Sequence, residues 1–151
     1  MTPRAETDRL RERDIPEIAA IEKLSFPDPW SEQSIREELT APRALCLVCR
    51  ENGRVIGYLG TRTVLDECDI TNIAVHPEYR RQGVARLLLS SLLKELRDVR
   101  QINLEVRESN APARRFYEAA GFKECGRRRN YYETPREDAI LYTWFLEDGE
   151  C

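Results

Sequence analysis

Histidine and methionine each occur only once in this sequence of 151 residues, and cysteine occurs five times, an odd number. With His76 as the only imidazole, a metal site built from histidine and cysteine is not expected. Cys46 and Cys49 form a C-x-x-C, but in the strand-like run A-L-C-L-V-C-R their odd spacing sends the side chains to opposite faces, so we expect buried thiols. The odd count argues against a complete disulfide framework and favours a reducing compartment.

Long apolar runs are also missing, because none approaches the roughly 20 residues that a membrane-spanning helix needs. Residues 1–14 are charged throughout and lack the apolar stretch of a signal peptide. The formal net charge is −3 and the pI is about 5.4, so there is no general attraction to nucleic acid or to anionic membranes. We therefore expect a soluble, cytoplasmic protein with neither nucleic acid nor a membrane as a partner.

No repeat, low-complexity segment or linker divides the chain, so we predict one domain that covers residues 1–151. Apolar periodicity and turn residues predict strands at 6–10, 44–51, 54–65, 69–75, 101–106, 122–129 and 139–146. Helices are predicted after four signals, which are Asp14 as N-cap with Pro16 in the first turn, Ser31, Gly83, and Asn110 with Gly121 as the stop. Asn52-Gly53 favours a type I′ hairpin turn. The result is a mixed α/β fold about one sheet.

The run T-N-I-A-V-H-P-E-Y-R-R-Q-G-V-A, residues 71–85, is the most informative part of the chain. Its apolar strand stops at Pro77, which has no N–H to donate. Side-chain bulk is then lost at Gly83, where a helix begins, so the backbone can approach a ligand closely. The first N–H groups of that helix, its dipole and the guanidinium groups of Arg80 and Arg81 suit a pyrophosphate. An ordinary helix start is the alternative, and a Walker loop is excluded because no G-K-[ST] follows.

This run resembles the Q/R-x-x-G-x-G/A signature of the GNAT acetyltransferases, through Arg80, Gly83 and Ala85. The block L-E-V-R-E-S-N-A-P-A-R-R-F-Y-E-A-A-G-F, residues 104–122, resembles the second half of that family, and the resemblance extends over about 6–145. The segments F-P-D-P-W-S and R-R-N-Y-Y-E-T-P-R-E-D-A-I are similar to the RimI branch, which acetylates the N-terminal alanine of a small-subunit ribosomal protein. The resemblance implies a single-domain fold with a mostly antiparallel sheet flanked by helices. It also implies direct acetyl transfer from acetyl-CoA to a protein α-amine, without a metal.

The resemblance further implies which residues bind acetyl-CoA. The signature would hold the pyrophosphate, and the strand before it would lie along the pantetheine arm, with backbone N–H groups near Ile73 and Val75 bound to the acetyl carbonyl. Asn110 would contact the pantetheine arm in addition to capping its helix. The implied set is Ile73, Ala74, Val75, Arg80, Arg81, Gln82, Gly83, Val84, Ala85 and Asn110.

Glu105 is the first candidate for catalysis. In Q-I-N-L-E-V the apolar residues Ile102, Leu104 and Val106 take one face of a strand, which puts Glu105 on the other face. Taken alone, it is a partly solvated strand residue or a partner for Arg107. The resemblance implies a general base that acts directly or through water, and desolvation would raise the pKa of the carboxyl toward neutrality.

Tyr117 is the second candidate. A tyrosine on an amphipathic helix is more often a packing residue, as we expect for its neighbour Phe116. The resemblance implies that Tyr117 is the general acid that protonates the departing coenzyme A thiolate. Covalent catalysis is not expected, because no cysteine adjoins a histidine base.

The acceptor side is defined less sharply by the sequence. Asp66, Glu67 and Asp69 form an acidic cluster on which a basic peptide could dock, or they form a solvated turn. The resemblance places the acceptor between F-P-D-P-W-S and the C-terminal hairpin, where Trp30, Tyr131 and Tyr132 either line the site or close the core. The run of arginines at 127–129 is a solvated face or a phosphate site. Glu133 stands where the branch would have proline, and the segment from there to Arg136 looks short.

Three other functions fit the same residues. The first is the same fold acting on a small-molecule amine or a lysine. The second is a non-catalytic acetyl-CoA sensor, which would keep R-R-Q-G-V-A but need neither Glu105 nor Tyr117. The third is a structural partner domain, which acetyl-CoA would not stabilise. For the N-acetyltransferase itself we expect a monomer or a weak dimer.

Overall fold

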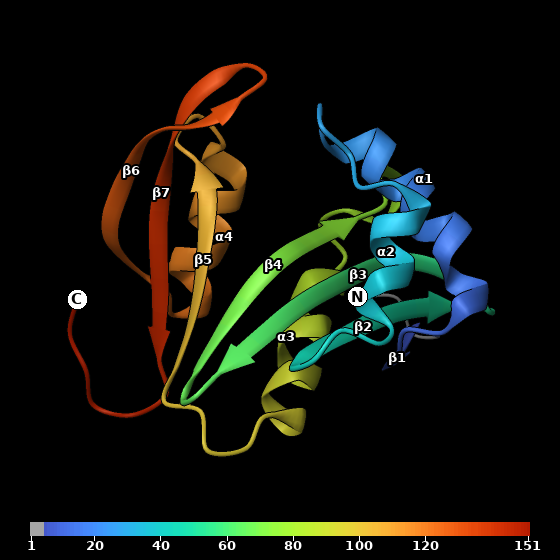
Figure 1. Cartoon of the computed structure of the whole chain (residues 1–151), viewed down its shortest axis with the longest axis horizontal. Helices are drawn as coiled ribbons and strands as arrows, with labels where there is room; N and C mark the ends of the chain where they lie inside the picture. The colour runs from blue at the N-terminus through green and yellow to red at the C-terminus, as the bar shows by residue number, and fades with distance from the viewer. Residues whose placement is uncertain (1–4) are drawn as a thin grey trace. The chain divides into compact units, whose positions relative to one another are not determined.

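The structure is a computed structural model that describes residues 5–151 (Figure 1). In that range the chain forms two compact units, one of residues 5–62 and 71–97 and the other of residues 63–70 and 98–151. Hydrogen-bonded neighbours follow the order β1-β2-β3-β4 and then β4-β5-β7-β6, so strand β4 contributes to both units. The predicted mixed α/β architecture is confirmed, and the β1–β2, β2–β3, β5–β7 and β6–β7 pairs are antiparallel whereas β4–β5 is parallel.

The elements lie close to the predicted ranges. The first unit is built on β1 (Ala5–Arg9), η1 (Glu12–Asp14), α1 (Ile15–Ser25), α2 (Glu32–Glu38), β2 (Ala44–Glu51), β3 (Arg54–Val64), the second half of β4 (Glu67–Val75), η2 (Pro77–Tyr79) and α3 (Val84–Glu95). The second unit adds β5 (Gln101–Arg107), α4 (Ala111–Ala120), β6 (Lys123–Glu133) and β7 (Arg136–Phe145). Asn52 and Gly53 have φ values of 52° and 80°, the positive φ that a type I′ turn requires at both central residues.

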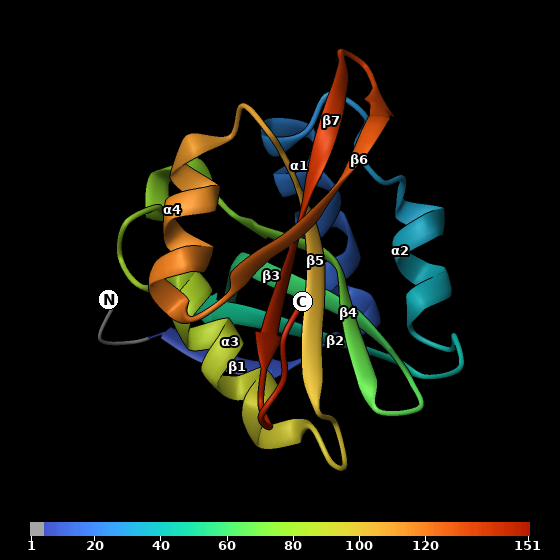
Figure 2. The same cartoon turned by 90° about the vertical axis from the view of Figure 1, so that its left-hand side faces the viewer.

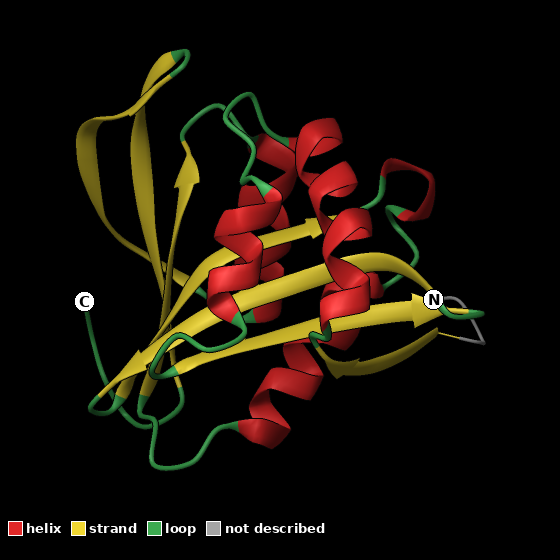
Figure 3. Cartoon of the chain, turned by 45° about the vertical axis from the view of Figure 1, so that its right-hand side comes forward, coloured by secondary structure: helices red, strands yellow, loops and turns green. Residues whose placement is uncertain are grey.

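In the first unit, helices α1 and α2 lie on one face of strands β2 and β3, and α3 lies on the other face (Figures 1 and 3). Gly57 of β3 lets α3 approach closely, because a Cβ at this position would lie 2.8 Å from Cγ1 of Val84 and 3.2 Å from the carbonyl oxygen of Ala74. The start of α3 is therefore seated directly on the sheet. The core between α1, α2 and the sheet consists of Ile15, Ile18, Ala19, Ile21, Ile35, Val48, Val55, Tyr58 and Ala74.

Asp14 occupies the predicted N-cap position of α1, but its carboxylate does not cap the helix. It accepts instead from the backbone N–H of Arg11 at 2.8 Å and from the Arg50 guanidinium at 2.5 and 3.0 Å. The Asp14 side chain is buried and Arg50 is nearly so. A cation from strand β2 thus competes successfully with the helix N–H groups for this carboxylate, which ties α1 to the sheet.

In the second unit, helix α4 lies against the strands, and β6 and β7 form a long twisted ribbon (Figure 2). The strands predicted at 122–129 and 139–146 stop short of the turn that joins them. In the structure, β6 continues to Glu133 and β7 begins at Arg136. Arg107 holds this tight turn by donating to the carbonyl oxygens of Thr134 and Pro135 at 2.9 and 2.8 Å. The polar run R-R-N-Y-Y shows no apolar alternation, which is why the sequence pattern ends the strand too early.

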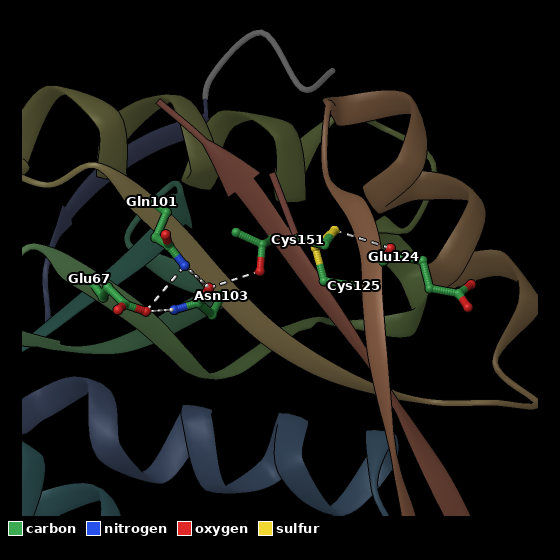
Figure 4. The surroundings of a disulfide bond; sticks show 7 residues. Glu67, Gln101, Asn103, Glu124, Cys125 and Cys151 are labelled. Carbon is green, nitrogen blue, oxygen red and sulfur yellow. Dashed lines mark hydrogen bonds between the residues drawn. A yellow bond between two sulfur atoms is a disulfide. The ribbon is translucent and has the colours of Figure 1, made fainter. Parts of the chain in front are cut away.

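The cysteines differ in part from expectation. Cys125 and Cys151 form a disulfide bond next to Glu124, so the prediction of a reduced set of cysteines is wrong for this pair (Figure 4). The two are 26 residues apart, and nothing local in the sequence shows that the C-terminal segment returns to β6. Cys46 and Cys49 are free thiols, as predicted, and burial raises the pKa of each to about 11.

Two predicted absences can be examined over residues 5–151. Within that range no helix has both the length and the apolar character to cross a membrane. The same residues contain no group of three or more histidine, cysteine or acidic side chains placed to hold a metal ion.

Candidate active site

In the first unit, residues 80–85 form the loop that leads into α3 and the start of that helix, and this candidate anion-binding segment is called the cradle. Strand β4 ends at Val75, and the chain turns through η2, where the backbone N–H of Glu78 donates to Nδ1 of His76. Two positions after η2 have left-handed backbone, Arg81 with φ 64° and Gly83 with φ 82°. These two residues turn the loop into the start of α3. The backbone N–H of Leu87 donates the first helical hydrogen bond, to the carbonyl oxygen of Gly83 at 3.0 Å.

Side chains within the cradle stabilise its shape. Nε of Arg80 donates to the carbonyl oxygen of Val75 at 3.3 Å, and Nε2 of Gln82 donates to the carbonyl oxygen of Glu78 at 3.3 Å. Arg80, Arg81 and Gly83 are exposed, so charge and unencumbered backbone face solvent together. Val84 is buried and anchors the helix, whereas Ala85 and Gln82 are half-buried. The cradle can bind a diphosphate through N–H groups and guanidinium groups.

Strand β4, which precedes the cradle, alternates between buried and half-buried side chains near its end. Ala74 is buried and faces the core, while Ile73 and Val75 are half-buried. The N–H of His76 donates to the carbonyl oxygen of Ile56 at 2.8 Å, which fixes the end of β4 against β3. The binding of an acetyl carbonyl by N–H groups near Ile73 and Val75 stays a prediction.

In the second unit, Glu105 lies on the half-buried face of β5, opposite the buried residues Ile102, Leu104 and Val106. Desolvation by burial raises the pKa of the Glu105 carboxyl, Arg128 opposes this shift, and the negative charge of Asp69 adds to it. The alternative of a Glu105–Arg107 pair is not what forms, because Arg107 pairs with Glu137 at 3.2 Å. Glu105 is thus a half-desolvated carboxylate whose pKa is shifted toward neutrality.

Tyr117 lies on α4 and is 6% exposed, in contact with aromatic rings. Its ring centroid is 5.4 Å from that of Phe122 and 6.4 Å from that of Tyr142. Burial raises the pKa of the Tyr117 hydroxyl, and Tyr132 adds a smaller effect in the same direction. The hydroxyl therefore keeps its proton across the neutral range, as a proton donor must.

Tyr132 connects the two catalytic candidates electrostatically. Its pKa is raised to about 12, first by burial and then by the charge of Glu105, and Tyr132 in turn raises the pKa of Tyr117. The Arg107 guanidinium lies 4.3 Å from the centre of the Tyr132 ring, and Tyr131 packs edge-on against that ring. Tyr131 itself is 46% exposed. Within this unit, Tyr132 is therefore affected by the charge of Glu105 and in turn affects Tyr117.

Asn110 behaves as the predicted helix cap, since its side chain accepts from the N–H of Ala113 at 3.2 Å. Gly121 ends the helix in the left-handed conformation with φ 117°. Both local predictions are confirmed. Contact of Asn110 with a pantetheine arm stays a prediction.

The acidic cluster lies in the second unit, with Asp66 in the turn before β4 and Glu67 and Asp69 on β4, and Asp69 is exposed as a solvated turn would have it. Asp66 pairs with Arg100 at 2.8 Å. Glu67 accepts from both Gln101 and Asn103, at 3.2 and 3.0 Å (Figure 4). Asn103 also donates to Asp69 at 2.9 Å. These bonds hold the three carboxylates in place beside β5, and their contact with an acceptor stays a prediction.

Trp30 of the first unit is partly buried and packs against the core of α1 and α2. Its backbone N–H donates to Oε1 of Glu22 at 2.7 Å, and Glu22 is fully buried. Glu22 is a residue that pattern analysis missed, because its place in A-I-E-K-L is that of any charged helix residue. Its partner Asn72, which donates to Oε2 at 2.6 Å, was missed for the same reason.

The comparisons with known proteins identify the family. Residues 15–122 match the model of the acetyltransferase (GNAT) family. The chain is 43% identical over 136 residues to the ribosomal protein bS18-alanine N-acetyltransferase of Escherichia coli (strain K12), covering 87% of this chain and 91% of that protein. It is 38% identical over 138 residues to the protein of the same name from Haemophilus influenzae, covering 88% of this chain and 93% of that protein.

Among solved structures, the fold is similar to that of the ribosomal-protein-S18-alanine N-acetyltransferase from Escherichia coli, with a TM-score of 0.86 at 39% sequence identity. The match covers 97% of this chain and 96% of that one. The predicted GNAT fold is thereby confirmed. The chain belongs to the GNAT acetyltransferase family and is an acetyl-CoA-dependent N-acetyltransferase.

Proposed function

We propose that this enzyme acetylates the N-terminal α-amine of a protein, and specifically the N-terminal alanine of ribosomal protein bS18, the substrate in the names of its relatives. The observation that carries the proposal is Glu105, a half-buried carboxylate on β5 whose pKa is raised by burial. A weak base of this kind suits an α-amine, whose pKa of about 7.7–8.0 makes it about 3.5 kcal/mol easier to deprotonate than a lysine.

Each residue has one task in this proposal. Glu105 accepts the proton that the amine loses as its nitrogen attacks the thioester carbonyl carbon. Tyr117 donates its proton to the sulfur as the carbon–sulfur bond breaks. Ile73, Ala74 and Val75 lie along the pantetheine arm, with N–H groups near Ile73 and Val75 bound to the acetyl carbonyl. The remaining cofactor residues are Arg80, Arg81, Gln82, Gly83, Val84, Ala85 and Asn110.

On the acceptor side, Trp30, Tyr131 and Tyr132 contact the first residues of the peptide. Asp66, Glu67 and Asp69 attract a basic sequence after the alanine, because their charges stay fixed beside β5. The protein acts in the cytoplasm as one domain, and as a monomer or weak dimer.

The test is release of free thiol from acetyl-CoA with a basic, alanine-starting peptide, beside the same peptide with a blocked N-terminus. We expect turnover only with the free α-amine, and mass spectrometry should find the acetyl group on the alanine nitrogen. Silence with both peptides, despite measurable acetyl-CoA binding, would refute N-terminal transfer. Turnover on small amines or on lysine side chains would then support the alternative acceptors.

Gly83→Ala is expected to weaken acetyl-CoA binding about tenfold or more. Left-handed backbone costs an L-residue about 1–2 kcal/mol, and a loop that shifts to relieve this strain moves its N–H donors. Calorimetric titration measures the loss. Thermal unfolding checks it, because acetyl-CoA at about 100 times Kd should add about 2.7 kcal/mol to the free energy of unfolding of the unmodified protein.

Gly53→Ala is the matched control. Gly53 has φ 80°, close to the 82° of Gly83, but a Cβ there would meet no atom within 4 Å. Both variants carry the same backbone penalty, and only the one in the cradle should lose affinity. Equal acetyl-CoA affinity for the two variants would exclude the cradle as the diphosphate site.

A further inference from the structure

Glu22 is a buried carboxylate that the proposed catalytic steps do not use. It lies in α1 and is 0% exposed. Burial raises its pKa to about 7, against the opposing effect of hydrogen bonds from Trp30 and Asn72. A buried carboxylate costs free energy that an apolar side chain of similar size would not, so its presence calls for a role beyond packing.

Both carboxylate oxygens of Glu22 are used, and each binds a different part of the first unit. Oε1 accepts from the backbone N–H of Trp30 at 2.7 Å, in the segment that joins α1 to α2. Oε2 accepts from Nδ2 of Asn72 at 2.6 Å, in strand β4. The backbone carbonyl of Glu22 also accepts from the N–H of Phe26 at 2.9 Å. The Glu22 side chain therefore holds the Trp30 end of segment 26–30, whereas the bond to Phe26 is the ordinary backbone bond that ends α1.

The two segments that Glu22 joins have different tasks in the proposed function. Segment 26–30 carries Trp30, which is assigned to the acceptor peptide. Asn72 directly precedes Ile73, the first of the three β4 residues assigned to the pantetheine arm. Trp30 also packs on the core, and Ser31 after it caps α2 by accepting from the N–H of Ser34 at 3.1 Å. The Trp30 backbone is thus tied to α1 by the hydrogen bond to Glu22, in addition to the core packing of its ring and the helix cap that follows it.

We propose that Glu22 is a positioning residue that holds the acceptor-binding segment in register with strand β4. This inference rests on the proposed function, because that function assigns the acceptor to segment 26–30. Loss of the two hydrogen bonds lets the segment move while the cradle at the start of α3 keeps its own contacts. The KM for the acceptor peptide should therefore change, while the Kd for acetyl-CoA stays the same.

Glu22→Leu is the first variant to test. We expect the KM for the alanine-starting peptide to rise about tenfold or more, with the Kd for acetyl-CoA within a factor of about two of the unmodified value. Glu22→Gln should restore the KM to within about threefold. Its amide oxygen can accept from the N–H of Trp30 while its NH₂ group donates to a rotated Asn72 amide.

Glu17→Leu is the matched control. Glu17 also lies on α1, and its carboxylate accepts a hydrogen bond from the backbone N–H of Val55 in strand β3 at 2.9 Å. That bond does not involve segment 26–30. If Glu22→Leu does not fold, Asn72→Ala takes its place, because it removes one of the two bonds from a half-buried position. We expect it to raise the same KM by a smaller factor.

The outcomes separate the two proposals. If the unmodified enzyme shows no turnover of the alanine-starting peptide, both the proposed N-terminal function and this inference are refuted. An active enzyme whose folded Glu22→Leu or Asn72→Ala form keeps the original peptide KM would overturn the inference alone. So would an equal loss of acetyl-CoA affinity in Glu22→Leu and Glu17→Leu, because that pattern describes a general structural role.

Discussion

Glu105→Gln is expected to lower kcat for the alanine-starting peptide by about 10²- to 10⁴-fold at neutral pH, the range over which general-base catalysis contributes. Glutamine keeps the size and the hydrogen-bonding reach of the side chain but cannot accept the amine proton. The Kd for acetyl-CoA should be unchanged, since the cradle residues are untouched. Steady-state kinetics with the peptide, together with calorimetric titration of acetyl-CoA, measure both quantities.

The pH dependence gives this prediction a second readout. Burial raises the pKa of Glu105, so its carboxylate is lost as pH falls through that raised value, and kcat/KM should fall with it. Above the pKa of the α-amine, about 7.7–8.0, a growing share of the substrate is already deprotonated. The defect of Glu105→Gln should therefore shrink toward pH 9.5.

The control for Glu105 is Glu124→Gln. Glu124 is an exposed carboxylate of β6 that pairs with Arg114 at 2.9 Å, and its loss should leave kcat unchanged. If Glu105→Gln keeps kcat within about threefold of the unmodified enzyme at pH 7, Glu105 is a strand residue and water or another group takes the proton.

Tyr117→Phe should lower kcat about 10²-fold or more, since it removes the proton for the departing thiolate. The substitution is conservative in shape. The ring contacts with Phe122 and Tyr142 stay in place. The hydroxyl that is removed is uncharged, because burial raises its pKa. Thermal unfolding should change little, so a loss of rate is attributable to the proton. Thiol release under saturating substrates gives the rate.

Tyr142→Phe is the control for this variant, because Tyr142 is the neighbouring buried tyrosine with a structural hydroxyl. That hydroxyl donates to Glu118 at 2.6 Å and accepts from Nε of Arg114 at 3.1 Å. Its loss should lower stability and spare kcat. Full activity in Tyr117→Phe would favour a packing role for that ring, and full activity in both Glu105→Gln and Tyr117→Phe would leave the reaction without its two assigned groups.

Local patterns predicted much of this molecule. The stop of β4 at Pro77, the cap at Asn110 and the left-handed exit at Gly121 each depend on a backbone property of one residue, and the sequence displays such properties directly. The alternation of β5, which separates Glu105 from the core, depends on seven consecutive residues and was equally visible.

The remainder depended on contacts between distant parts of the chain. Glu22 acquires its role from Asn72, 50 positions later, and Asp14 loses its helix cap to Arg50, 36 positions later. Gly57 matters because α3 lies against it, which no property of β3 alone reveals. The β6–β7 turn is held by Arg107, a residue of a different strand. Each of these is a tertiary contact that overrides a local preference.

The arginines of β6 have a consequence for the enzyme in solution. Within residues 5–151, strand β6 pairs only with β7 and ends the strand order, so its outer row of N–H and C=O groups has no ladder partner in that range. Such an edge is a template for a strand from another chain. Arg127, Arg128 and Arg129 are exposed along it, and the register shifts twice in β6, between Glu124 and Gly126 and again before Tyr132. Charges and bulges of this kind disfavour edge-to-edge pairing, so we expect β6 to resist the addition of a strand from another chain.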